Sequence, residues 1–293
     1  MLDIRFIREQ PELVKERLAA RGGEDAAKID ELLAVDVERR KGETAVQQLN
    51  ADRKRLSKEI GGKRSRGEAS EDLENQVREI GDRISVLNEQ TLASDEKQRT
   101  LLLNIPNLPH AAAPIGKEAS DNPVVREWGE KPALSGTVQD HVAIGERLRL
   151  FDLERAAKLS GSGFICFIGA GAKLERALIQ FMLDLHTREH GYLEMSPPFL
   201  VRRDCMIGTT QLPKFEDDMY GLEENQLFLA PTAEVPVTNF HREEILPAAE
   251  LPKKFVAYTP CFRREAGSAG RETRGIIRVH QFDKVELVKI TTP

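Results

Sequence analysis

The chain has 293 residues, a mass of 32.9 kDa and a formal net charge of −5, which leaves room for about two domains. No apolar run reaches the roughly 18 residues that a membrane-spanning helix needs, and the segment from Met1 to Arg5 lacks the basic start and apolar run of a secretory signal. Cys166, Cys205 and Cys261 have neither the even number nor the paired spacing of a disulfide framework or a zinc ribbon. These features favour a cytoplasmic protein that does not associate with membranes.

Charge is distributed unevenly along this acidic chain. Residues 201–250 carry four Lys or Arg against ten Asp or Glu, whereas residues 251–293 carry nine against four. A second basic patch within residues 53–66 has only Glu59 as an acid and contains Arg53, Lys54, Arg55, Lys58, Lys63, Arg64 and Arg66. Local patches of this kind decide which anions a protein meets, so both are candidate binding surfaces.

The first hundred residues predict a helical arm. A short amphipathic helix is expected over residues 4–20, and Gly22 and Gly23 end it. Heptad positions that are mostly apolar then recur in two runs, with gaps in the apolar seam. The first run, in which six of nine residues are apolar, is Leu32, Val35, Arg39, Gly42, Val46, Leu49, Arg53, Leu56 and Ile60, and the second is Leu73, Val77, Ile80, Ile84, Leu87 and Thr91. Gly61 and Gly62 are expected to break the helix, so two helices of about 30 residues should fold back as an antiparallel pair roughly 45 Å long with residues 61–67 at its tip.

The remainder of the chain predicts a linker followed by a mixed α/β region. Residues 104–132 contain five prolines and little periodicity. A helix is expected over 174–190, and strands are expected over 192–195, 227–229, 254–259 and 276–282, with the alternation continuing over 283–289. Residues 265–275 would then form a long glycine-containing loop between two antiparallel strands.

The densest cluster of chemically active residues lies between 259 and 278. Five arginines in this segment could close over a polyphosphate, because each offers paired donors to phosphate or carboxylate. A solvated basic hairpin is an equally good interpretation of the same pattern. The rival phosphate motifs fail, since residues 169–173 lack the lysine and hydroxyl order of a P-loop and residues 161–166 lack the third glycine of a dinucleotide fingerprint.

Other candidate groups have simpler explanations. His186 and His190 could share a zinc ion on one helix face, but the glutamate that should follow the first histidine is absent, which favours plain helix-end histidines. Cys261 is expected to be a small core residue and not a nucleophile. Glu234 and Glu286 are acids among apolar strand residues; beside an arginine cluster they could stay ionised and bind an ammonium group.

Several long segments resemble one enzyme family. Residues 259–289 resemble motif 2 of seryl-tRNA synthetases, and residues 211–222 and 230–246 resemble the segments ahead of that motif. Residues 1–22 resemble the N-terminus of the bacterial enzymes, and residues 190–201 resemble motif 1 of class II synthetases. The likeness extends along the whole chain.

The resemblance implies an α+β protein, with an N-terminal antiparallel coiled-coil arm followed by an incomplete class II antiparallel-sheet catalytic domain. The expected limits are 1–103 for the tRNA-binding domain with the arm at about 28–100, 104–135 for the linker and 136–293 for the partial catalytic domain. It further implies ATP and Mg²⁺, serine, the long variable arm of tRNA-Ser on the seven basic residues 53–66, and a homodimer formed through motif 1.

The family's roles fall on named positions of this chain. Arg263, Arg278 and Glu286 would be catalytic, and Glu286 could also lie near magnesium. Serine would be bound by Thr232, Ala233, Glu234, Arg263 and Glu286. ATP would be bound by Arg263, Arg264, Glu265, Arg278, Val279, His280, Gln281 and Phe282, with Phe282 stacked under adenine and Glu265 at the adenine edge.

The sequence also departs from the family pattern. Gly163 replaces a larger, often basic residue, which suggests a looser strand edge, and Arg264 replaces the usual serine and adds charge at the pocket mouth. After Lys289 the sequence has four more residues, whereas the family continues through motif 3. We therefore expect little or no seryl-adenylate formation by this chain alone. The alternatives are an inactive tRNA-binding fragment, or a coiled-coil protein with a scaffold domain, although the arginine cluster argues against a scaffold.

Overall fold

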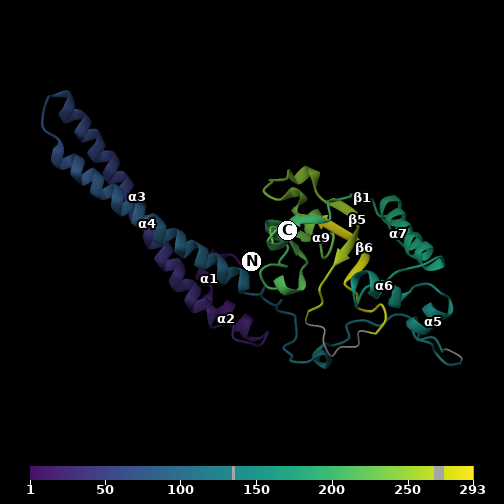
Figure 1. Cartoon of the computed structure of the whole chain (residues 1–293). Helices are drawn as coiled ribbons and strands as arrows, with labels where there is room; N and C mark the ends of the chain where they lie inside the picture. Colours follow the sequence, from purple (N-terminus) through teal and green to yellow (C-terminus); the bar gives the residue numbers. More distant parts are fainter. Residues whose placement is uncertain (134–135, 267–273, 293) are drawn as a thin grey trace. The chain divides into compact units, whose positions relative to one another are not determined.

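The computed structural model of the chain describes residues 1–133, 136–266 and 274–292 (Figure 1). Contacts divide the chain into two compact units, Met1–Gly129 and Glu130–Pro293. The change of unit falls inside the predicted linker 104–135, which contains the 3₁₀ turn η1 (Ala119–Asp121); the domain limits themselves stay predictions. Within the described ranges, no helix is long and apolar enough to cross a membrane.

The arm consists of α3 (Lys28–Ser65) and α4 (Glu71–Asn104), which pack along each other over most of their length (Figure 1). At ~1.5 Å per residue, α3 is about 57 Å long. The predicted break at Gly61 and Gly62 is wrong, because α3 continues through both; a glycine costs a helix about 1 kcal/mol, which weakens a long helix without ending it. The chain turns at Gly67, whose φ of 73° is a left-handed conformation that favours glycine.

The predicted heptad seam is confirmed where α3 and α4 meet. Leu56 of α3 and Ile84 of α4 are buried, which a pair of helices achieves only along the line of mutual contact. Gly42 faces Thr91 so closely that a Cβ atom on Gly42 would overlap the threonine hydroxyl. This glycine, which is a weak residue in a helix, therefore allows the two backbones to approach.

The base of the arm holds the core of the first unit. The predicted helix 4–20 is interrupted, and forms α1 (Ile4–Glu9) and α2 (Pro11–Ala19), because Pro11 has no backbone N–H to donate and suits the first position of a new helix. The core cluster is Ile7, Val14, Leu18, Ile29, Leu32, Leu102 and Ile105.

A buried carboxylate also joins three helices at this base. Asp36 of α3 is 1% exposed and accepts hydrogen bonds from Arg8 Nη1 at 3.1 Å and from Gln98 Nε2 at 3.0 Å. A buried charge is tolerated when it is paired and hydrogen-bonded in this way. Asp36 therefore ties α1 and α4 to the lower part of α3.

The second unit is built on a sheet with the order β1–β5–β6 among the described residues, in which β1 is parallel and β6 is antiparallel to β5. The helix α7 packs against β5 and β6 (Figure 1). A second small sheet has the order β2–β4–β3, and its core cluster includes Phe228 and Met206. The elements are α5 (His141–Arg147), α6 (Leu153–Ser160), α7 (Ala170–Arg188), β1 (Leu193–Glu194), β2 (Leu200–Arg202), α8 (Arg203–Gly208), η2 (Glu216–Asp218), β3 (Gly221–Leu222), β4 (Leu227–Leu229), α9 (Glu234–Thr238), η3 (Asn239–His241), η4 (Ala248–Glu250), β5 (Lys253–Phe262) and β6 (Gln281–Ile290).

The β5–β6 hairpin begins its pairing later than the sequence predicts. Residues 276–280 were expected in a strand but form turns and bends, and the ladder starts where Phe262 pairs with Gln281. From there β6 continues to Ile290, so the predicted alternation over 283–289 is confirmed. Of the predicted loop 265–275, residues 267–273 lie outside the described part of the chain, Arg271 among them.

Candidate functional site

One face of the β5–β6 hairpin gathers most of the residues predicted to bind serine and ATP. Because side chains alternate along a strand, Phe282, Lys284 and Glu286 share this face of β6. Their cross-strand partners on β5 are Cys261, Thr259 and Ala257, which are small and completely buried. The hairpin thus presents an aromatic ring, a lysine and a carboxylate in a row on β6, beside a row of small residues on β5.

Thr232 connects this face to the segment before α9. Its hydroxyl donates to Glu286 Oε2 at 2.7 Å and accepts from Lys284 Nζ at 2.8 Å and from the backbone N–H of Glu234 at 3.2 Å. Thr232 is 3% exposed and Ala233 is fully buried, whereas the Glu234 side chain is exposed. Three of the predicted serine-binding residues, Thr232, Glu234 and Glu286, therefore belong to one hydrogen-bonded network.

Arg263 lies at the other end of the same face. Its guanidinium carbon is 5.2 Å from the centroid of the Phe282 ring, which is a cation–π distance. Its Nε donates to the carbonyl of Pro231 at 3.4 Å, directly before Thr232. Arg263 is thereby held between the aromatic ring and the threonine segment, where an anionic group of a ligand could meet it.

Glu265 and Arg278 form an ion pair of 2.7 Å next to this face. The guanidinium of Arg278 is 38% exposed and the Glu265 side chain 17%. Glu265 is the first residue of the predicted loop 265–275 and Arg278 follows its last residue by three positions, so the pair links the two sides of this loop.

Further contacts anchor the same two ends. Asp218 of η2 accepts from the backbone N–H groups of Arg264 and Ala266, each at 2.8 Å. At the return, Ile276 donates its backbone N–H to His141 Nε2 at 3.1 Å. Arg274 pairs with Asp140 at 2.9 Å, and the pKa of Asp140 is lowered mainly by the backbone N–H of Ala143 and further by this arginine.

His280 fits closely against Gly163. The backbone N–H of His280 donates to Gly163 O at 2.8 Å, and its Nδ1 donates to the Arg263 carbonyl at 3.0 Å. Gly163 has φ of 83°, and a Cβ atom there would overlap the His280 ring. The glycine that departs from the family pattern therefore permits this histidine contact. Of the neighbouring residues in the predicted ATP set, Val279 is buried and Gln281 is exposed at the start of β6.

The opposite face of the hairpin carries a separate polar cluster under α7. Tyr258 of β5 donates its hydroxyl to Asp283 Oδ1 of β6 at 2.7 Å. Glu175 of α7 lies against the same aspartate; burial, together with the interaction with Asp283, raises the pKa of Glu175 to about 7. Burial and Asp283 also raise the pKa of Tyr258. A carboxyl group that keeps its proton near neutral pH thus joins the helix to the sheet.

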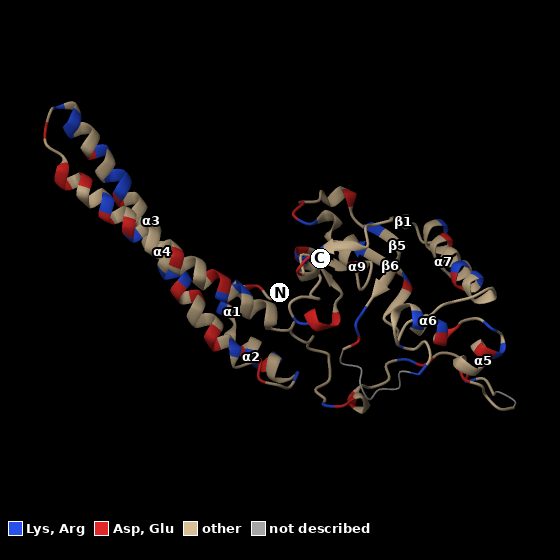
Figure 2. Ribbon diagram, in the orientation of Figure 1, with Lys and Arg blue, Asp and Glu red and all other residues tan. Residues whose placement is uncertain are grey.

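The seven basic residues within 53–66 fall into two groups. Near its free end, Lys and Arg lie on α3 and acids lie on α4 (Figure 2). Arg64 pairs with Glu74 at 2.8 Å, Arg66 with Glu68 at 2.7 Å, and Arg55 with Asp52 at 3.2 Å. The others form no ion pair with any described residue, and they are Arg53, Lys54, Lys58 and Lys63.

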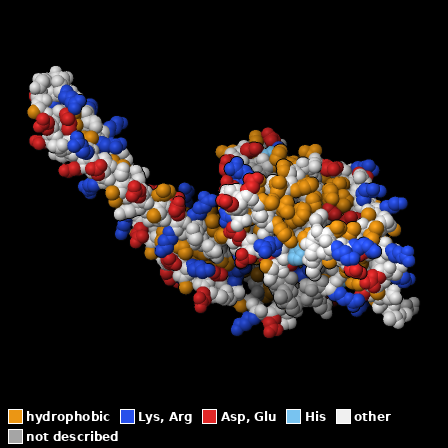
Figure 3. Space-filling view, in the orientation of Figure 1, with side chains coloured by type: hydrophobic (Ala, Val, Ile, Leu, Met, Phe, Trp, Pro, Cys, Tyr) orange, Lys and Arg blue, Asp and Glu red, His pale blue; other side chains and the backbone are white. Residues whose placement is uncertain are grey.

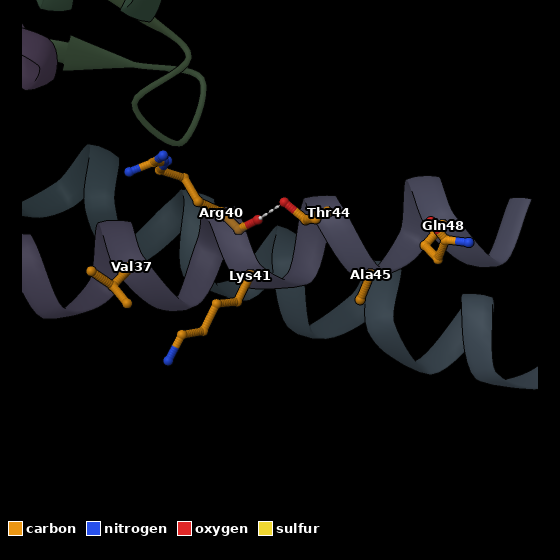
Figure 4. A pocket seen from close by; sticks show the side chains of 6 residues that line it. All are labelled: Val37, Arg40, Lys41, Thr44, Ala45 and Gln48. Atoms are coloured by element: carbon orange, nitrogen blue, oxygen red, sulfur yellow. Dashed lines mark hydrogen bonds between the residues drawn. The ribbon is translucent and has the colours of Figure 1, made fainter. Parts of the chain in front are cut away.

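A groove on the surface of α3 is a poor candidate for a ligand site. It is open, and its lining comes from one helix, where Thr44 donates its hydroxyl to the Arg40 carbonyl at 2.8 Å (Figure 4). The lining residues are Val37, Arg40, Lys41, Thr44, Ala45 and Gln48. A single helix cannot enclose a small molecule, so this groove adds nothing to the chemistry of the hairpin face.

The simpler interpretations of the remaining candidates agree with the structure. His186 and His190 have Nδ1 atoms 2.9 Å apart, but no group of three or more His, Cys, Asp or Glu able to hold a metal occurs among the described residues. Cys261 is completely buried, and burial raises the pKa of its thiol, which suits a core residue and not a nucleophile.

Sequence reasoning missed residues whose role comes from contacts between distant segments. Lys284 is the main one, and its signal was the alternation that places it with Phe282 and Glu286 on β6. Asp218 and His141 act through the backbone N–H groups that they bind. No pattern near Asp218 or His141 in the sequence indicates those partners.

Comparisons with known proteins agree with this geometry. The family model described as the seryl-tRNA synthetase N-terminal domain matches residues 1–109, and the tRNA synthetase class II core domain (G, H, P, S and T) matches residues 214–293. The chain is 54% identical over 293 residues to a serine--tRNA ligase of Akkermansia muciniphila and 49% identical to that of Methylacidiphilum infernorum; it is covered completely and spans 68% and 69% of these relatives.

A solved structure supports the same assignment. The crystal structure of seryl-tRNA synthetase from Pyrococcus horikoshii complexed with ATP is similar to this chain with a TM-score of 0.86 and 39% identity, over 98% of this chain and 69% of that one. The helical arm, the β5–β6 face and the matches over the entire length therefore lead to one conclusion. The chain belongs to the seryl-tRNA synthetase, or serine--tRNA ligase, family.

Proposed function

We propose that the face of the β5–β6 hairpin is the serine- and ATP-binding face of a serine--tRNA ligase, on which the enzyme of full family length forms seryl-adenylate and then transfers serine to the 3′ end of tRNA-Ser. The observation that supports this most strongly is the network of Thr232, Glu286 and Lys284 beside Arg263 and Phe282. One end of the face can bind an amino acid, and the other offers an arginine over an aromatic ring to a nucleotide.

The proposed roles follow from this arrangement. Arg263 binds the serine carboxylate and the α-phosphate and stabilises the charge that develops in the in-line attack, without a covalent enzyme intermediate. Phe282 supports the adenine ring and Glu265 meets its edge, while Arg278 meets the outer phosphates. Arg264 adds charge at the mouth, and Val279, His280 and Gln281 form the approach to β6.

The amino-acid end selects serine by its polar groups. Thr232 and Glu234 take the ammonium group, Ala233 leaves space for the ligand, and Glu286 accepts the serine hydroxyl. A carboxylate that accepts this hydroxyl discriminates against alanine, because the smaller ligand has no hydroxyl to donate and loses this hydrogen bond to Glu286.

Magnesium is part of the proposal only through ATP. Mg²⁺ usually bridges phosphate oxygens and takes one or two carboxylates from the protein. Glu286 was the predicted protein ligand, but its Oε2 contacts the Lys284 ammonium, and the described residues contain no cluster that could hold a metal by themselves. The side chains around Glu286 therefore do not suit Mg²⁺ as a ligand set.

The test of the serine end is Glu286→Gln. We expect the affinity for serine to fall by about 10- to 100-fold and the affinity for ATP by less than about threefold, since the amide keeps the shape but loses the charge that strengthens the hydrogen bond from the serine hydroxyl. Calorimetry with each ligand separates the two effects, and serine-dependent exchange of pyrophosphate into ATP reports the reaction. Glu189→Gln, an exposed neighbour of α7, is the matched control. Equal losses for serine and ATP would contradict the assignment of Glu286 to serine.

For the arm, we propose that it binds the backbone of the long variable arm of tRNA-Ser through the basic residues 53–66. Replacing Arg53, Lys54 and Lys58 together by alanine should weaken tRNA binding and lower the slope of log affinity against log salt by about 2, at ~0.7–0.9 per phosphate neutralised. The pair Arg64→Ala and Arg66→Ala should change the slope less, because Glu74 and Glu68 already neutralise these arginines.

Filter binding over a range of salt concentrations measures both sets. Arg155→Ala with Lys158→Ala is the control, since these exposed basic residues lie on α6 in the other unit. An unchanged slope in the triple variant would reject the arm as an RNA-binding surface. Retained tRNA binding without any pyrophosphate exchange would favour the second candidate, a tRNA-binding protein without adenylation activity. The observation that supports this second candidate is the charge pattern of the arm.

We also propose a cytoplasmic homodimer that forms through the α7–β1 region. Hydrophobic side chains gather on the surface of this unit where β1 and β5 lie in Figure 1 (Figure 3). Large apolar residues that are exposed on α7, β1 and β2 include Leu174, Leu178, Phe181, Leu193 and Leu200. Contiguous apolar surface of this kind is typical of a protein interface.

A further inference from the structure

Lys284 has a place in the proposed serine pocket that none of the assigned roles explains. Its Nζ donates to Thr232 Oγ1 at 2.8 Å and contacts Glu286 Oε2. These two oxygen atoms belong to the groups proposed to take the ammonium and the hydroxyl of serine. The lysine ammonium thus lies against the polar groups that the substrate needs.

The surroundings of Glu286 explain why a cation is needed there. The Glu286 side chain is 21% exposed and lies beside Ala257 and Thr259 of β5, which are both completely buried. A carboxylate in such a place destabilises the fold unless it is paired. The hydroxyl of Thr232 satisfies part of Glu286 but brings no charge, so the lysine is the counter-charge.

The ligand brings a cation of the same kind. Serine carries a primary ammonium group with three donors, and so does the lysine side chain. The lysine stem is flexible and its side chain is 31% exposed, so it can move aside into solvent. Exchange of one ammonium for another keeps Thr232 and Glu286 oriented throughout and never leaves the carboxylate alone.

We propose that Lys284 is a positioning residue whose ammonium takes the ammonium subsite formed by Thr232 and Glu286 and is displaced by the ammonium group of serine. The proposal rests on the proposed function for the identity of the ligand, and on the contacts of Lys284 for the existence of the subsite. It makes the pocket selective for amino acids over the corresponding hydroxy acids, because a ligand without an amine cannot replace the lysine.

The first experiment needs no substrate. Thermal unfolding of Lys284→Met, Glu286→Gln and the double variant should be non-additive: Lys284→Met alone lowers the melting temperature by about 2–4 °C, and adding Glu286→Gln restores most of the loss, because the unpaired carboxylate is then gone. Additive effects would overturn the pairing of these residues.

The second experiment is chemical rescue of Lys284→Ala, which removes the whole side chain. Ethylammonium chloride should restore the melting temperature more than tetramethylammonium chloride at the same ionic strength, because only the primary ammonium can donate hydrogen bonds to Thr232 and Glu286. The unaltered chain should respond equally to the two salts. Equal responses in the alanine variant would overturn the subsite.

Serine then connects the subsite to the function. Saturating serine should abolish the selective rescue by ethylammonium, since both compete for one place. Persistent rescue in a chain that has bound serine would overturn the displacement of Lys284. If calorimetry shows no serine binding while the selective rescue is present, the proposed function fails and the ammonium subsite stands, so the two failures are distinguishable.

Discussion

In a chain of full family length, replacing Arg263 with methionine should lower serine-dependent exchange of pyrophosphate into ATP by about 10²–10³-fold, the loss that follows removal of one donor aimed at developing charge. Methionine keeps an unbranched apolar stem over Phe282 but removes the guanidinium group whose central carbon lies 5.2 Å from that ring. The melting temperature should change little, because the guanidinium makes a long hydrogen bond of 3.4 Å to the Pro231 carbonyl and a cation–π contact with Phe282, over which the methionine stem still packs.

The matched control for Arg263 is its neighbour. Arg264→Met removes the same charge one residue later, where the backbone N–H is anchored by Asp218 independently of the side chain. We expect its exchange rate to remain within about tenfold of the unaltered chain. Arg263→Lys should be intermediate, since it keeps the charge but loses the planar pair of donors. Exchange by Arg263→Met at the level of Arg264→Met would contradict the assigned role.

The second large effect concerns stability and pH. The pKa of Glu175 in the folded protein is raised to about 7, above its ordinary value of 4.5. Between these two pH values the folded state binds more protons than the unfolded state, so the free energy of unfolding should fall as pH rises. The contribution is fully present below about pH 4.5 and is lost as pH rises through about 7, when Glu175 ionises.

Glu175→Gln tests this directly. The amide donates a hydrogen bond to Asp283 at every pH, so the variant should melt about 2–4 °C above the unaltered chain near pH 8 and show little difference near pH 5. Thermal unfolding across this range measures both. Asp283 on β6 and Tyr258 on β5 face the same group and remain in place. Glu146→Gln on α5 is the control, and the same pH slope in Glu175→Gln as in the unaltered chain would exclude Glu175 as the responsible group.

The arm was predictable because local periodicity determines it. Leu56 and Ile84 lie at heptad positions, and their burial follows from spacing alone. The predicted break at Gly61 and Gly62 was wrong because the helix penalty of a single glycine does not end a long, continuous helix. Residues 276–280 show the reverse problem: they are apolar enough for a strand, but the backbone groups of Ile276 and His280 bind His141 and Gly163 instead.

The site was predictable only in part. The resemblance brought Arg263, Thr232 and Glu286 together, and the structure places them around one face. Lys284 was overlooked because a lysine in a strand usually faces water, and only the contact with Thr232, 52 residues away in the chain, shows otherwise. Long-range contacts of this kind leave no local pattern.

The alternation of β6 has a consequence for how this segment can change during evolution. Phe282, Lys284 and Glu286 face the ligand side, whereas Asp283 faces α7. Insertion or deletion of one residue within the strand would exchange the two sets, presenting Asp283 to the ligand and turning Glu286 toward the helix. Substitutions can therefore accumulate at single positions of β6, but a change of length removes the binding face and the helix contact in one event. We expect natural variation in length to be confined to the connections on either side of this strand.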